Sequence, residues 1–277
     1  MEGPDVSADR PSPLVPVHLS TSSVYPEGPG YCFDLAERLG YDGVEVMVWS
    51  DEVTQEAKPL IALSRLHGMP IGAIHAPTLL LAQRLWGWDA WGKIDRSLDL
   101  ARDVGAPVVV VHPPFRWQSR YAEGFVEGVA TRARDSGVTI AVENMFPWRV
   151  GSTELQAYLP AHDPTDLPYE HLTFDVSHAG TAGSDALLML QELGPRVAHV
   201  HLGDSFGTFK DEHLVPGRGV QRCAEVLQHL VHSNYAGVVS LEVSTRKVDR
   251  AQREFDLEES LAFARTHLST PAVTSGP

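Results

Sequence analysis

The 277-residue sequence lacks the features that direct a chain to an oxidising or membrane environment. It has two cysteines, Cys32 and Cys223, which are far apart and outside any CxxC motif. This excludes a disulfide framework and a cysteine-based metal or redox motif. No apolar run approaches the roughly 20 residues that span a bilayer, and the chain does not begin with a basic and then apolar leader. We therefore expect a cytoplasmic protein that does not bind membranes.

Basic residues are also scarce. Lys and Arg number 22 against 36 Asp and Glu, so the formal net charge is −14, and no Lys/Arg-rich run is present. Duplex nucleic acid is bound mainly by Lys and Arg that neutralise phosphates. We therefore expect no nucleic-acid partner. The apolar fraction of 43% and the charged fraction of 21% are those of an ordinary globular protein.

Short β-branched apolar segments alternate with longer segments that have helical periodicity. Strict alternation implies a parallel sheet, and eight units in this length predict an α/β fold, the (β/α)8 TIM barrel, over residues 14–268. Residues 1–13 and 269–277 are polar and broken by proline or glycine, and we expect them to be disordered tails. An open doubly wound sheet is the alternative, although no glycine-rich turn follows the first strand. The predicted strands are residues 15–19, 43–48, 71–75, 108–112, 139–143, 172–175, 197–202 and 238–242, and the predicted helices are residues 32–39, 91–104, 121–136, 186–193, 223–232 and 255–267.

Six of the predicted strands, the third to the eighth, carry an imidazole or a carboxylate at or next to their last residue. In a barrel these side chains would meet at the carboxyl ends of the strands, where barrel enzymes have their active sites. An ionisable group is costly there unless it is paired or binds a metal, and a mixture of His and carboxylates suits Zn²⁺, Mn²⁺, Co²⁺ or Fe²⁺ better than Mg²⁺ or Ca²⁺. His178 in DVSH and the DxH pair Asp211 and His213 extend the set, so that one to three ions could be held. The six strand-end residues are His75, His112, Glu143, Asp175, His201 and Glu242.

Other residues near these motifs have two interpretations each. Glu45 in GVEVMVW either hydrogen-bonds substrate or a ligating histidine, or forms a salt bridge at the barrel rim. His199 shares a strand face with His201 and is expected in the core or behind the ligands. Arg218 lies in a Gly-Arg-Gly turn before a predicted helix and could bind a phosphate or carboxylate, unless the segment is only a turn. Trp117 follows the fourth strand and either lines a pocket or packs.

These motifs make the sequence similar to the xylose-isomerase-like barrels, which include sugar-phosphate isomerases and epimerases, inosose dehydratases and endonuclease IV. The resemblance extends over residues 15–268. In the epimerase branch, Glu, Asp, His and Glu from strands five to eight bind one metal, which implies Glu143, Asp175, His201 and Glu242 here. In the endonuclease branch five more residues complete a trinuclear zinc site. At these positions this sequence has His75, His112, His178, Asp211 and His213.

The resemblance implies a divalent-metal-dependent isomerase or epimerase whose substrate is a sugar, a sugar phosphate or a cyclitol. Glu143 and Glu242 would be the acid–base pair, and His178 and Arg218 would orient hydroxyls or a phosphate. Two alternatives stay open: a multinuclear-metal phosphoester hydrolase of the endonuclease IV type, and a keto-sugar dehydratase or lyase. The apolar segment APTLLLAQRLWGWDAW after the third strand fits a cavity lid better than a DNA clamp. Barrels of this family often pair through their helices, which implies a homodimer.

Overall fold

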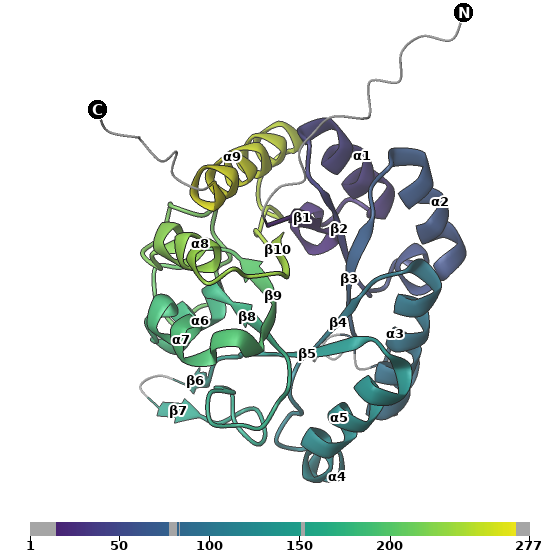
Figure 1. Ribbon diagram of the computed structural model, residues 1–277, viewed down its shortest axis with the longest axis vertical. Coiled ribbons are helices and arrows are strands. Elements are labelled where there is room, and N and C mark those ends of the chain that lie inside the picture. Colours follow the sequence, from purple (N-terminus) through teal and green to yellow (C-terminus); the bar gives the residue numbers. More distant parts are fainter. Residues whose placement is uncertain (1–14, 78–81, 83, 151–152, 270–277) are drawn as a thin grey trace, which may run out of the picture.

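The computed structural model describes residues 15–77, 82, 84–150 and 153–269. Within them, eight parallel strands close into a barrel surrounded by helices (Figure 1). The ring closes because β1 pairs with both β2 and β10, which confirms the predicted (β/α)8 TIM barrel. The ring order is β1-β10-β9-β8-β5-β4-β3-β2. The strands are β1 (Val17–Ser20), β2 (Gly43–Met47), β3 (Ile71–His75), β4 (Val108–Val111), β5 (Thr139–Glu143), β8 (Leu172–Asp175), β9 (Val197–Leu202) and β10 (Val238–Leu241).

The helices begin and end close to the predicted positions because the local signals are strong. Gly40, Gly68, Gly105 and Gly137 adopt left-handed conformations that end α1, α2, α3 and α5. The helix predicted over residues 121–136 is instead two helices separated at Gly124, and α2 and α6 were not predicted. The helices are α1 (Pro29–Leu39), α2 (Ala57–His67), α3 (Ala90–Val104), α4 (Ser119–Glu123), α5 (Phe125–Ser136), α6 (Val176–Ala182), α7 (Ala186–Leu193), α8 (Cys223–His232) and α9 (Arg250–Leu268), with 3₁₀ turns η1 (Thr21–Val24), η2 (Glu52–Gln55) and η4 (Gly194–Arg196).

The two faces of the strands have different surroundings. Outward residues such as Val44 and Phe174 belong to the main apolar core, which includes the helices. Ala73, Val110 and Ala141 instead form, with Val108, a separate small cluster. The inner face of β3, β4 and β5 therefore carries small apolar residues. Their small size leaves room inside the barrel for polar side chains.

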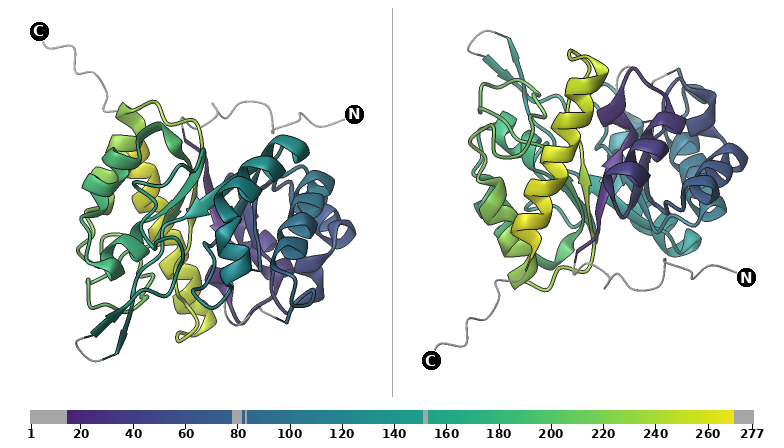
Figure 2. Two further views of the ribbon diagram at one scale, coloured as in Figure 1. Left: turned by 90° about the horizontal axis from the view of Figure 1, so that it is seen from below. Right: turned by 90° about the horizontal axis from the view of Figure 1, so that it is seen from above.

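One feature of the described chain lies outside the barrel. A hairpin of β6 (Trp148–Val150) and β7 (Thr153–Leu155) follows β5 and projects from the body of the protein (Figure 2). The tails expected at residues 1–13 and 269–277 fall, apart from Ser269, outside the described residues. Among the helices described, none combines the length and the apolar character needed to cross a membrane.

Candidate metal centre

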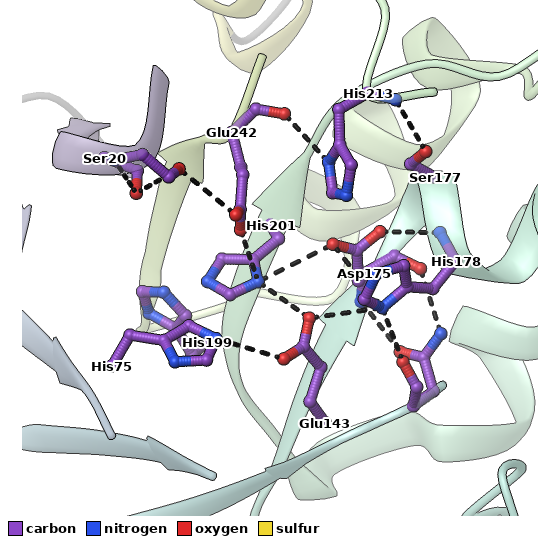
Figure 3. Close-up of polar contacts among 12 residues, drawn as sticks. Ser20, His75, Glu143, Asp175, Ser177, His178, His199, His201, His213 and Glu242 are labelled. Atoms are coloured by element: carbon purple, nitrogen blue, oxygen red, sulfur yellow. Dashed lines mark hydrogen bonds and ion pairs between the residues drawn. The ribbon is translucent and has the colours of Figure 1, made fainter. Parts of the chain in front are cut away.

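Four side chains from the ends of neighbouring strands converge on one point (Figure 3). Nδ1 of His201 on β9 lies 3.0 Å from Glu143 Oε1, 3.2 Å from Glu242 Oε2 and 3.6 Å from Asp175 Oδ2. All four residues are buried except Glu242, whose side chain is 14% exposed. One imidazole nitrogen and three carboxylate oxygens therefore face each other at the floor of the barrel mouth.

These donors fit a divalent cation. Two ligands of one ion, each about 2.1 Å from it, are separated by about 3.0 Å at a right angle and about 3.4 Å at a tetrahedral angle. The separations from His201 Nδ1 to Glu143 Oε1 and Glu242 Oε2, 3.0 and 3.2 Å, lie in this range, and the 3.6 Å to Asp175 Oδ2 is slightly longer. In addition, Oδ2 of Asp175 is buried and has no hydrogen-bond partner among the described residues. An unpaired buried carboxylate oxygen is costly, and a cation bound at this point would compensate for that cost.

Asp175 is held rigidly by the chain around it. Its Oδ1 accepts a hydrogen bond of 2.7 Å from the backbone N–H of His178 and so caps the N-terminus of α6. Asn144, which follows β5, accepts from the backbone N–H of Asp175 at 2.7 Å and donates to its carbonyl at 3.0 Å. These contacts use Oδ1 and the backbone, which leaves Oδ2 directed at His201.

Two further donor groups flank the convergence point. On one side, Glu143 Oε2 lies 2.8 Å from His112 Nε2 and 3.4 Å from His75 Nε2. On the other side, Asp211 Oδ1 lies 2.8 Å from His213 Nε2 and 3.7 Å from His178 Nε2. The structure thus brings together all nine residues that the sequence marked as candidate ligands.

The centre concentrates negative charge. Burial raises the pKa of the Glu143 carboxyl, but His201 and His112 outweigh it and hold that pKa well below its usual range. Burial lowers the pKa of His178, whereas Asp175 and Asp211 raise it, to about 9. Ionised carboxylates at this site therefore require positive charge, either as imidazolium or as a bound cation.

Glu45 lies in the middle of β2 and is completely buried. It accepts hydrogen bonds from His199 Nε2 at 2.6 Å and from His201 Nε2 at 3.1 and 3.2 Å. It does not line the cavity above the centre. Glu45 thus makes the predicted contact with a candidate ligand, and its contact with substrate stays a prediction. His199 lies behind the candidate ligands.

The other two predicted substrate contacts, Arg218 and Trp117, do not line this cavity. Arg218 Nη2 forms ion pairs with Asp256, at 2.8 Å, and Glu259 on α9, so its side chain is held by these carboxylates and its contact with substrate stays a prediction. Trp117 is 53% exposed, stacks on Phe115 with ring centroids 4.7 Å apart, and lines a separate cavity of about 240 Å³.

The cavity over the centre has a volume of about 560 Å³. Much of its wall comes from the end of β2 and from loops after β1, β2 and β10. Among these residues the sequence indicates Trp49, an aromatic one residue after the second predicted strand, where it can wall a pocket. The wall residues from these segments include Ser22, Tyr25, Met47, Trp49, Asp51, Ser244 and Arg246.

Comparison with known proteins agrees with the barrel fold. Residues 33–267 match the profile of the xylose isomerase-like TIM barrels. The protein belongs to this family. Relatives of this xylose isomerase-like barrel include uncharacterized proteins of Mycobacterium tuberculosis, 48% identical, and Mycobacterium leprae, 46% identical. Each alignment covers 92% of this chain and 99% of the relative.

Solved structures share the fold of this xylose isomerase-like barrel at lower sequence identity. A D-tagatose 3-epimerase-like protein superposes with a TM-score of 0.66 at 23% identity, over 92% of this chain and all of the other. The 3-keto-D-glucoside 4-epimerase of E. coli gives 0.67 at 18%, over 91% and 99%. The D-psicose 3-epimerase of Clostridium cellulolyticum gives 0.68 at 15%, over 92% and 100%.

Proposed function

We propose that the protein is a divalent-metal-dependent isomerase or epimerase that acts on a polyhydroxylated carbonyl compound, such as a sugar, a sugar phosphate or a cyclitol. The observation that carries this proposal is the convergence of Glu143, Asp175, Glu242 and His201 Nδ1 at the floor of an open cavity. The names of the structural neighbours, epimerases of tagatose, psicose and a keto-glucoside, support it.

The four residues would hold Zn²⁺, Mn²⁺, Co²⁺ or Fe²⁺, which would act as a Lewis acid toward a carbonyl and the neighbouring hydroxyl. Glu143 and Glu242 stand on β5 and β10, three positions apart in the ring, and both line the cavity. One carboxylate removes the proton next to the carbonyl and the other returns a proton to the opposite face, which inverts that carbon. His178, at the cavity wall, orients substrate hydroxyls.

Metal content and one substitution test this function. Protein purified without added metal or chelator should contain about one equivalent of Mn, Co, Fe or Zn by elemental analysis, and a screen of ketoses and inososes should then detect turnover. Glu242→Gln should lower kcat by about 10²- to 10⁴-fold, the usual contribution of a general acid–base. Asp256→Asn, which changes a buried carboxylate on α9, is the control. Wild type that binds none of the four ions in a titration, or full activity of Glu242→Gln, would overturn the proposal.

A second function has its own supporting observation. The pairs His75–His112 and His178–His213, with Asp211, provide donors for two ions beyond the first, which suits hydrolysis of a phosphoester by a multinuclear centre. Two to three equivalents of metal, together with cleavage of bis-p-nitrophenyl phosphate, would favour it. A dehydratase or lyase would start with the same proton abstraction, so loss of water from the product separates it from an epimerase.

A further inference from the structure

The first two strands of the barrel provide none of the nine candidate ligands, yet they contact two of them. Glu45 on β2 accepts hydrogen bonds from His201, and Ser22, just after β1, donates to Glu242 Oε1 at 3.1 Å. Ser20 connects the two contacts, because its hydroxyl donates to Glu45 Oε1 at 3.3 Å and lies 2.9 Å from the hydroxyl of Ser22. The contacts form one continuous polar network below and beside the ligands.

Glu45 provides the hydrogen-bond acceptor for one of the two ring nitrogens of His201. Nε2 of His201 lies 3.1 and 3.2 Å from the two oxygens of Glu45, and a carboxylate accepts hydrogen bonds. With an ion among the carboxylates on the Nδ1 side, the proton of His201 would stay on Nε2, where Glu45 accepts it. The lone pair of Nδ1 is then directed at Glu143, Asp175 and Glu242, as a metal ligand requires.

Glu45 is itself held on its other side. His199 Nε2 donates to Glu45 Oε2 at 2.6 Å, and all three residues, Glu45, His199 and His201, are completely buried. The carboxylate therefore has little freedom to move away from His201. Because His199 holds the carboxylate of Glu45 in place, this carboxylate fixes the ring plane of His201 as well as its tautomer.

Ser22 contacts one of the two carboxylate oxygens of Glu242, and the other oxygen faces His201. Its hydroxyl donates to Oε1, while Oε2 lies 3.2 Å from His201 Nδ1. The chain places Ser22 there because η1 begins directly after β1, with the Ser20 side chain accepting the backbone N–H of Ser22 as its cap. The segment Ser-Thr-Ser-Ser after the first strand thereby takes part in the site.

We infer that Glu45 and Ser22 are positioning residues, which hold His201 and Glu242 in the orientation and, for His201, the tautomer that an ion requires. This inference rests on the metal site of the proposed function. It predicts that ion affinity depends on two residues that do not themselves bind the ion.

The test is competitive Zn²⁺ titration of the full-length protein against a chromogenic chelator. Glu45→Gln should weaken Zn²⁺ binding by about 10- to 100-fold, the usual effect of removing a partner of a ligating histidine, and Ser22→Ala should weaken it by a smaller factor. Asp256→Asn and Ser260→Ala, which change a buried carboxylate and a buried serine on α9, should bind Zn²⁺ like wild type. The visible spectrum of bound Co²⁺ should change in Glu45→Gln and not in the two α9 variants.

A measurement on wild type does not depend on whether a variant folds. In the Zn²⁺-loaded protein, ¹⁵N NMR should show His201 bound through Nδ1 with its proton on Nε2. Binding through Nε2, a Glu45→Gln protein with wild-type affinity, or an equal loss in the α9 variants would overturn the inference while the metal site itself stands. Wild type that binds no ion would overturn the proposed function, and the inference with it.

Discussion

His18 should make the stability of the protein depend on pH in the mildly acidic range. The side chain lies on β1 inside the barrel and its residue is 5% exposed. Burial, with a contribution from His199, lowers its pKa from 6.5 to about 4. The folded protein therefore keeps His18 neutral at a pH where the unfolded chain already binds a proton.

The sign and size of this pH dependence follow from the difference between the folded and unfolded pKa values of His18. Because the folded pKa lies below the unfolded one, the contribution of His18 is fully present above about pH 6.5 and is lost as the pH falls toward 4. At about 1.36 kcal/mol per pKa unit, wild type should lose about 2 kcal/mol near pH 5 and about 3 kcal/mol near pH 4 from this residue alone.

Urea unfolding of metal-free wild type and His18→Asn measures the effect. The free energy of unfolding of wild type minus that of the variant should fall by about 2 kcal/mol between pH 7.5 and pH 5. His171→Asn, which changes a histidine 37% exposed on its side chain, is the control and should show no such trend. A wild-type minus His18→Asn difference that is constant with pH would refute the reasoning.

Three further predictions address packing and the site. Gly72→Ala should lower the free energy of unfolding in urea by about 1–3 kcal/mol or more, because a Cβ at this position would lie 2.1 Å from the His18 ring. The double variant with His18→Ala should recover part of this loss. No recovery would show that another contact is responsible. Glu143→Gln should retain less than one equivalent of metal by elemental analysis, because the substitution removes the negative charge of a carboxylate that contacts four histidines. A variant with the metal content of wild type would contradict this prediction. Arg218→Ala should leave KM unchanged and cost less than about 1 kcal/mol of stability, because its ion pairs are partly exposed; a large rise in KM would support its role in substrate binding.

The strands and the ligand cluster could be predicted from the sequence because both depend on local patterns. Each apolar run in this chain is short, and the residue that ends it has a fixed place in a parallel barrel. Thus His75, Glu143 and Asp175 end β3, β5 and β8 as predicted. His112 and Glu242 follow β4 and β10 by one residue and still point to the centre.

The features that the sequence did not predict have physical causes that a local pattern does not contain. Arg218 pairs with Asp256 and Glu259, which are distant in sequence and become neighbours only when α9 packs beside the loop. Gly124 separates α4 from α5, although the apolar spacing continues across it. One interpretation placed Glu45 at the barrel rim, but β2 continues to Met47, so its side chain lies one layer deeper than the candidate ligands.

One part of the cavity wall comes from a different part of the chain than the donor cluster. Tyr25, Trp49 and Asp51 line the cavity from loops after β1 and β2, whereas the nine donors lie on β3 and the segments after it. Substitutions at these three wall positions therefore need not disturb the nine candidate ligands. Under the proposed function, a library that varies only Tyr25, Trp49 and Asp51 would alter which compound is accepted and leave the candidate metal centre intact. The same separation would let related barrels diverge in substrate while they keep one chemistry.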